Sequence, residues 1–223
     1  MISRDHLAKM IDHSLLNPSI TEEGVKKGCQ EALRYGFAAV VVNPSHVAIV
    51  ARELRSSAVK VCSVISFPFG LSTTVDKAHE TRTALEQGAD EIDMVINFSA
   101  LKSGHSDLVL KDISGVVQEA RRTQGKIVKV ILENCYLTEN EKREACQLTV
   151  QGGADFVKTS TGFGKSGATV EDVQLMRQIV GPRFGVKAAG GIRNLEQALQ
   201  MVEAGANRIG ASASVSIIES LKP

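Results

Sequence analysis

The sequence predicts an α/β protein that folds as one (β/α)8 TIM barrel spanning residues 1–223. Short β-branched runs alternate with longer helical stretches, a pattern typical of parallel α/β folds. A junction in which a glycine ends a helix and small residues lead into a strand recurs at positions 36, 88, 153 and 205. Each interval between these glycines holds two β-α units, so the four junctions mark four pairs, or eight units. Eight units without a linker favour a closed barrel, and an open doubly wound sheet is the alternative.

The strands are expected in short apolar runs that precede turn residues. They are placed at residues 11–15, 38–43, 60–66, 91–97, 127–133, 155–160, 185–189 and 207–211. The first is the least typical, because Asp12-His13-Ser14 has a low strand propensity.

The helices between them carry recognisable start signals. Thr21 precedes two glutamates, which is a helix cap followed by acidic residues in the first turn. Residues 66–70 are expected to form a loop, after which Thr73 or Thr74 caps a helix that ends near Gly88. The charged run 139–144 is expected to be a solvated helix face.

Composition excludes several classes of protein. The chain has 26 Lys and Arg against 25 Asp and Glu, a balance that argues against a nucleic-acid partner or a polybasic membrane surface. No apolar run approaches the roughly 18 residues that cross a bilayer. The segment 1–6 lacks the apolar core of a signal peptide, so we expect a cytoplasmic protein.

Cysteines and histidines show no metal-ligand or disulfide spacing. Cys29, Cys62, Cys135 and Cys146 form no CxxC motif and are expected to be packing residues in a reducing compartment. The histidines are also scattered, at positions 6, 13, 46, 79 and 105. We therefore expect no metal and no cofactor. His13, next to Asp12, is expected to orient a group at the barrel mouth.

Two lysines stand near the ends of successive strands, each just ahead of glycines. Lys158 closes the run Phe156-Val157-Lys158, and Lys187 precedes Gly190-Gly191. A lysine in a buried strand is costly unless it is paired or neutral. Strand alternation turns several charged residues to the same barrel mouth, namely Asp12, Asp93, Lys129, Lys158 and Lys187. The alternative is that each lysine only forms a salt bridge with a neighbouring carboxylate.

A pair of lysines can produce an amine nucleophile. An ordinary lysine has a pKa of about 10.4 and is almost fully protonated at neutral pH. A second ammonium about 6 Å away, at an effective dielectric near 20, would lower that pKa by about two units, and desolvation would supply the remainder. The free amine could form a Schiff base with a carbonyl substrate. Spacing alone does not identify which lysine reacts.

Asp93 is the candidate for proton transfer. It is an isolated acid in the apolar run 92–96. The alternative is a strand-end carboxylate paired with Lys129, and both descriptions can hold together.

A phosphate site is expected after the last two strands. Gly190 and Gly191 follow the seventh strand, and the segment 210–214, which includes Ser212, follows the eighth and opens the last helix. Backbone amides at such turns bind phosphate, although ordinary tight turns are the alternative. The segment 162–166 is similar to a P-loop, but Thr159 stands where that motif requires glycine.

The chain resembles the deoxyribose-phosphate aldolases over nearly its whole length. The resemblance rests on five motifs: Asp12-His13-Ser14-Leu15-Leu16, Phe67-Pro68-Phe69-Gly70, Glu91-Ile92-Asp93-Met94-Val95-Ile96-Asn97, Ala154-Asp155-Phe156-Val157-Lys158-Thr159-Ser160-Thr161-Gly162 and Val186-Lys187-Ala188-Ala189-Gly190-Gly191. It implies a metal-independent class I aldolase that interconverts 2-deoxy-D-ribose 5-phosphate with glyceraldehyde 3-phosphate and acetaldehyde.

The resemblance also implies roles for individual residues. Lys158 would form the Schiff base, Lys187 would donate protons and lower the pKa of Lys158, and Asp93 would relay protons. The substrate phosphate would be held by Gly162, Gly190, Gly191 and Ser212. We also expect Lys129 and Asp12 to bind substrate at the same mouth.

Three positions depart from the family pattern. Many members carry a cysteine where this chain has Val41, so we expect no thiol-mediated inactivation by product aldehydes. A second serine often follows the one at Ser212, and here it is Ala213, which predicts a weaker phosphate grip or one made by backbone alone. Some members end in a tail with a tyrosine, whereas this sequence ends at Leu221-Lys222-Pro223, so no tail-borne role is transferred.

Two other functions stay open at this point. A phosphosugar isomerase or epimerase would use Asp93 as its base and would turn over an aldose phosphate without a trappable imine. A non-catalytic phosphosugar-binding barrel would be stabilised by ligand without aldol exchange. The sequence also leaves open whether the chain is a monomer, a dimer or a tetramer.

Overall fold

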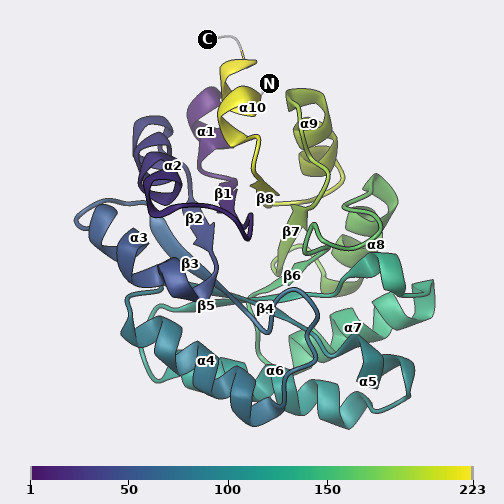
Figure 1. The fold of residues 1–223 in the computed structure, drawn as a ribbon. Helices are drawn as coiled ribbons and strands as arrows, with labels where there is room; N and C mark the ends of the chain where they lie inside the picture. Colours follow the sequence, from purple (N-terminus) through teal and green to yellow (C-terminus); the bar gives the residue numbers. More distant parts are fainter. Residues whose placement is uncertain (1, 222–223) are drawn as a thin grey trace.

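Eight parallel strands form a closed barrel in a computed structural model that describes residues 2–221 (Figure 1). The strands pair in chain order from β1 to β8, and β8 closes the barrel on β1. The predicted (β/α)8 barrel is confirmed, and the open sheet is wrong. Met1 of the amino-terminal segment and Lys222-Pro223 of the carboxyl end lie outside the described residues.

The observed strands agree with the expected ones to within one or two residues at each end. They are β1 (Ile11–Leu15), β2 (Ala39–Val42), β3 (Lys60–Ile65), β4 (Glu91–Val95), β5 (Ile127–Ile131), β6 (Phe156–Lys158), β7 (Gly185–Ala189) and β8 (Arg208–Ala211). β1 forms despite its low propensity because it pairs with a strand on each side and its Asp12 binds cations inside the barrel.

Helices surround the strands on the outside of the barrel (Figure 1). They are α1 (Arg4–Ala8), α2 (Glu22–Tyr35), α3 (Val47–Glu53), α4 (Thr74–Glu86), α5 (Phe98–Lys102), α6 (Ser106–Arg121), α7 (Glu139–Gln151), α8 (Val170–Val180), α9 (Leu195–Glu203) and α10 (Ser214–Glu219), with 3-10 turns η1 (Pro44–His46) and η2 (Asn134–Tyr136). Within the described part of the chain, none of these helices combines the length and the apolar character needed to cross a membrane.

The start signals and the repeated glycines behave as expected. Thr21 accepts a hydrogen bond from the backbone N–H of Gly24, and Thr73, not Thr74, caps α4. The four junction glycines all have positive φ, at 68°, 106°, 79° and 110° in chain order. A side chain there would be strained, so these glycines let each helix turn directly into the next strand.

The charged run at the start of α7 is only partly solvated. Glu139 and Asn140 are exposed, but Lys142 reaches Asp172 of α8 at 2.6 Å and both side chains are largely covered. The expectation of a simple solvated face is therefore wrong for Lys142, which α8 partly covers, and it holds for Arg143, whose side chain is 41% exposed.

The main apolar core lies between the strands and the helices, where outward-facing strand residues such as Val40, Ile92 and Val130 are fully buried. Inside the barrel, a smaller apolar cluster covers one side and consists of Ala39, Val41, Cys62 and Val64, with Leu16 and Phe67 packed against it. The rest of the interior combines charged side chains with apolar ones such as Val95 and Ile131, which share their strand faces with Asp93 and Lys129.

Candidate active site

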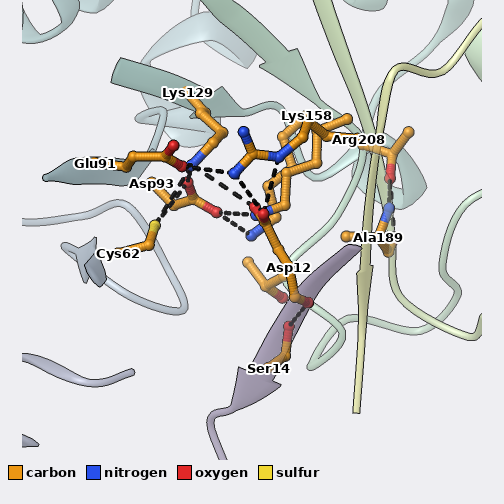
Figure 2. A network of polar contacts seen from close by, with 12 residues as sticks. Asp12, Ser14, Cys62, Glu91, Asp93, Lys129, Lys158, Ala189 and Arg208 are labelled. Carbon is orange, nitrogen blue, oxygen red and sulfur yellow. Dashed lines mark hydrogen bonds and ion pairs between the residues drawn. The ribbon is translucent and has the colours of Figure 1, made fainter. Parts of the chain in front are cut away.

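Seven ionisable side chains meet inside the barrel and form one connected set, which we call the inner network. Figure 2 labels all of them except Lys187. The members of the network are Asp12 on β1, Glu91 and Asp93 on β4, Lys129 on β5, Lys158 on β6, Lys187 on β7 and Arg208 on β8. The network therefore holds four bases and three acids, and a neutral lysine would balance its charge.

Asp93 is the centre of the inner network. Its Oδ1 accepts a hydrogen bond from Lys129 Nζ at 2.7 Å. Its Oδ2 accepts from Lys158 Nζ at 2.8 Å and from Lys187 Nζ at 2.7 Å. Burial alone would raise the pKa of Asp93, but the three ammonium groups lower it well below the ordinary carboxyl range. Asp93 is thus an ionised acceptor shared by both candidate amines, and its pairing with Lys129 is also present.

The lower part of the inner network joins Asp12, Glu91 and Arg208. Arg208 Nε donates to Asp12 Oδ1 at 2.9 Å, and its Nη2 donates to Glu91 Oε2 at 2.8 Å. Glu91 also pairs with Lys129 at 2.6 Å, and Lys187 donates to Asp12. Arg208 and Glu91 were not predicted as site residues. Strand alternation could have suggested both, because Arg208 shares its face with Gly210 and Glu91 shares its face with Asp93.

A cavity of about 620 Å³ opens at the carboxyl ends of β1, β6, β7 and β8. Lys158 lines it, together with the four residues expected to hold phosphate, Gly162, Gly190, Gly191 and Ser212. Lys187 and Asp93 do not line it and lie in the inner network beneath. Lys129 and Asp12 also lie beneath, fully buried, so the expectation that they contact substrate is not supported by their position.

The pKa values of the three barrel lysines are shifted in different directions. Burial lowers the pKa of Lys158; Asp93 opposes this effect and the neighbouring charge of Lys187 adds to it. Burial also disfavours the charge of Lys187, but Asp12 and Asp93 outweigh it and raise the pKa of Lys187. The pKa of Lys129 is raised well above the ordinary lysine value, because the carboxylates around it likewise outweigh the effect of burial. Desolvation is therefore the main cause at Lys158, whereas we expected the second ammonium to be the larger one.

Residues 6–217 match the model of the family described as DeoC/LacD family aldolase. The chain belongs to this family.

Relatives of this aldolase extend over almost the same length. It is 58% identical over 221 residues to the deoxyribose-phosphate aldolase of Thermococcus gammatolerans, which covers 98% of this chain and 97% of the relative. It is 55% identical over 217 residues to that of Caldanaerobacter subterraneus subsp. tengcongensis, with 97% and 94% covered. A solved structure, described as a unique tetrameric deoxyribose phosphate aldolase from Aeropyrum pernix, is 37% identical with a TM-score of 0.91 and covers 98% of this chain and 92% of that chain.

Two departures from the family pattern lie close to the site of the aldolase. Val41 is fully buried on the inner face of β2, in the small apolar cluster. Ala213 stands at the start of α10, where no side chain caps the helix.

The cysteines differ in their surroundings. Burial raises the pKa of Cys29 to about 11 and of Cys146 to about 12, as expected for packing residues. Cys62 is different, because its Sγ lies 3.2 Å from Asp93 Oδ1 and the thiol therefore contacts the inner network. Burial raises the pKa of Cys62 far above its ordinary value, so it is a neutral donor to Asp93.

His13 points away from the inner network. Its ring packs on Phe37 and its Nε2 lies 3.3 Å from Glu31 of α2, at the edge of the cavity. Burial lowers the pKa of His13 and Glu31 opposes the change. Within residues 2–221, no group of three or more His, Cys, Asp or Glu side chains is arranged to hold a metal ion.

Proposed function

We propose that this aldolase reversibly cleaves 2-deoxy-D-ribose 5-phosphate to glyceraldehyde 3-phosphate and acetaldehyde through a Schiff base on Lys158. One observation carries the assignment of the nucleophile. Of Lys129, Lys158 and Lys187, only Lys158 lines the cavity, and only its pKa is lowered. A neutral amine that faces a substrate-sized cavity is what attack on a carbonyl requires.

The first step joins Lys158 to the open-chain aldehyde. The amine attacks C1 of the sugar, and the resulting carbinolamine loses its hydroxyl as water to give an iminium. Asp93 Oδ2 lies 2.8 Å from Lys158 Nζ, so it can accept the proton that the amine releases on attack. Lys187 shares that oxygen and can return the proton through water to the departing hydroxyl.

The second step breaks the C2–C3 bond. Its electron pair moves to C2 and forms an enamine on Lys158, while the C3 hydroxyl loses its proton and becomes the aldehyde of glyceraldehyde 3-phosphate. Protonation of C2 and hydrolysis of the new iminium then release acetaldehyde and restore the amine. Because Asp93 and Lys187 lie beneath the cavity, we infer that bound water carries their protons to the substrate.

The phosphate of the sugar would lie at the glycine-rich turns that line the cavity after β6, β7 and β8. Gly190 and Gly191 have φ of 88° and 78°, backbone geometry that exposes successive amides. Gly162 and Ser212 line the same cavity. We infer that these groups bind the phosphate and that Ala213 contributes only backbone. The free cysteines suit a reducing compartment, so we also infer a cytoplasmic role in the breakdown of deoxyribose phosphate.

A reductive trap tests the proposal. Borohydride added with acetaldehyde should attach an ethyl group to Lys158, located by tryptic mass mapping, and EDTA should leave the activity intact. Lys158→Arg should abolish both the label and turnover. Turnover of an aldose phosphate without any label would instead indicate an isomerase, and stabilisation by the phosphosugar without exchange would indicate a binding protein.

A further inference from the structure

Glu133 lies just beyond the end of β5 in an unusual backbone conformation. Alternation along the strand would have turned it inward with Lys129, but β5 ends at Ile131. Glu133 has φ 55° and ψ 59°, which is the left-handed region, and it precedes the short turn η2. A non-glycine residue held there is strained, and such residues are often found at functional sites. Its side chain is buried, with 1% of its surface exposed.

The carboxylate of Glu133 binds the loop that follows β6. It accepts hydrogen bonds from the Thr161 hydroxyl and from the Thr161 backbone N–H, the latter at 3.3 Å and 3.4 Å to its two oxygens. Among the described residues, no basic side chain comes within ion-pair distance of it. Lys158 is close enough to favour its charge, but burial is larger and raises the pKa of Glu133. The carboxylate is therefore directed at the loop and not at a cation.

Thr161 in turn constrains the residues that follow it in the loop. Its hydroxyl accepts a hydrogen bond from the backbone N–H of Phe163 at 3.0 Å, which fixes both sides of Gly162. The chain then crosses directly over the glutamate, since a Cβ on Gly164 would lie 3.1 Å from Glu133 Cδ and 2.7 Å from Cys135 Sγ. Thr161, Gly162 and Phe163 all line the cavity.

The start of the loop is fixed separately. The backbone N–H of Asn134 donates to Thr159 O at 3.0 Å, and Thr159 Oγ1 bonds both the carbonyl and the N–H of Ala189 on β7. Glu133 is thus the side chain that fixes the segment beyond Thr159, where the cavity begins.

We propose that Glu133 is a positioning residue that holds Thr161 and Gly162 so that the phosphate end of the substrate is placed correctly relative to Lys158. The inference rests on the proposed function, because it assigns the phosphate to this loop. It predicts that loss of the carboxylate harms a phosphorylated sugar more than the same sugar without phosphate.

The test compares 2-deoxy-D-ribose 5-phosphate with 2-deoxy-D-ribose. Glu133→Gly removes the carboxylate and suits the left-handed backbone. We expect the ratio of kcat/KM for the two sugars to fall by roughly tenfold or more, mainly through KM for the phosphorylated sugar. Acetaldehyde carries no phosphate, so borohydride trapping at Lys158 should be retained.

Further variants separate positioning from general damage. Thr161→Val removes the hydroxyl and should lower the same ratio. If Glu133→Gly does not fold, the result with Thr161→Val tests the inference in its place. Thr161→Ser keeps a hydroxyl and should restore the ratio. Glu80→Gln is the matched control, because Glu80 is also a partly buried glutamate that accepts a backbone N–H, that of Ser66 at 2.8 Å, and it lies outside the cavity lining. It should leave the ratio unchanged.

Two results would overturn the inference. One is an unchanged ratio in both Glu133→Gly and Thr161→Val, and the other is an equal loss for both sugars. If the wild-type protein itself fails to trap acetaldehyde, the proposed function fails instead, so the two failures are distinguishable.

Discussion

Asp93 Oδ2 accepts hydrogen bonds from both Lys158 and Lys187, so the two amines are coupled through one atom. Lys187 keeps its proton because it also donates to Asp12, whereas Lys158 has Asp93 as its only ion-pair partner among the described residues. The opposite pKa shifts of the two amines therefore follow from how many carboxylates each amine reaches.

Replacement of Lys187 should change the pH dependence of Schiff-base formation. The charge of Lys187 helps to lower the pKa of Lys158, so Lys187→Met should raise that pKa and reduce the fraction of free amine at neutral pH. We expect the acid limb of the acetaldehyde trapping rate to move to higher pH. Turnover should fall by roughly 10²-fold or more, because a proton donor is also lost.

The trapping rate measured across the pH range checks this. Lys165→Met is the control, since Lys165 is exposed on the loop near the mouth and lies outside the inner network. An acid limb that stays in place in Lys187→Met would contradict the proposed electrostatic role.

The meeting of Lys158, Lys187 and Asp93 could be predicted from the sequence, but the relative size of the effects on the pKa of Lys158 could not. Lys158, Lys187 and Asp93 meet as expected, because strand alternation and parallel pairing determine which side chains face inward. How deeply Lys158 is buried depends on the packing of the whole barrel. Because Lys158 is deeply buried, desolvation, and not the charge of Lys187, is the main cause of the lowered pKa of Lys158.

At the scale of elements, the alternation of residues along a strand does not predict the direction of side chains beyond the end of that strand. The alternation of β5 predicts that Glu133 faces inward, yet the chain leaves the ladder after Ile131 and Glu133 turns to Thr161 instead. Arg208 was missed for another reason. Its strand is short, and a charged residue at a strand start is usually solvated, whereas here Asp12 and Glu91 pair with it inside the barrel.

Helices α4 and α6 are joined by a buried ion pair. Lys77 Nζ lies 2.6 Å from Asp112 Oδ2, and Thr74 also donates to Asp112. Asp112→Asn should leave a buried ammonium without its counter-charge and lower the free energy of unfolding by about 3–5 kcal/mol. Urea unfolding monitored by circular dichroism measures the change.

The matching control is an exposed pair on α7. Arg143→Gln removes the partner of Glu139, and because both side chains are substantially solvated, its effect on unfolding should be close to zero. Equal effects of Asp112→Asn and Arg143→Gln would show that the buried pair contributes no more than a surface one.

At the scale of the whole molecule, the inner network makes stability depend on pH. Burial would raise the pKa of Asp12, but Lys187, Arg208 and Lys129 lower it. A carboxyl with a lowered folded-state pKa stabilises the fold fully above its unfolded pKa of about 3.9, and this contribution is lost as the pH falls towards the folded value.

Asp12→Asn should therefore be less stable than the wild type by about 3–5 kcal/mol at pH 7, since Arg208 and Lys187 lose a counter-charge. The difference should narrow once the pH falls below about 4. Urea unfolding of both proteins at pH 7 and at acidic pH tests this. A difference that stays constant across the range would show that Asp12 does not stabilise the fold through its charge.

The charged inner network lies beneath a glycine-rich rim of loops around the cavity, and this separation indicates where the aldolase can be redesigned. Each ionised side chain of the inner network has at least one counter-charge, so a single exchange leaves another member unbalanced. The rim segments 161–164 and 190–193 carry none of these pairs. Phe163 and Arg193 are exposed rim residues that line the cavity, so libraries that vary them and keep the rim glycines should leave most members folded while they explore new aldehydes. Variation of the inner network would need compensating pairs introduced together.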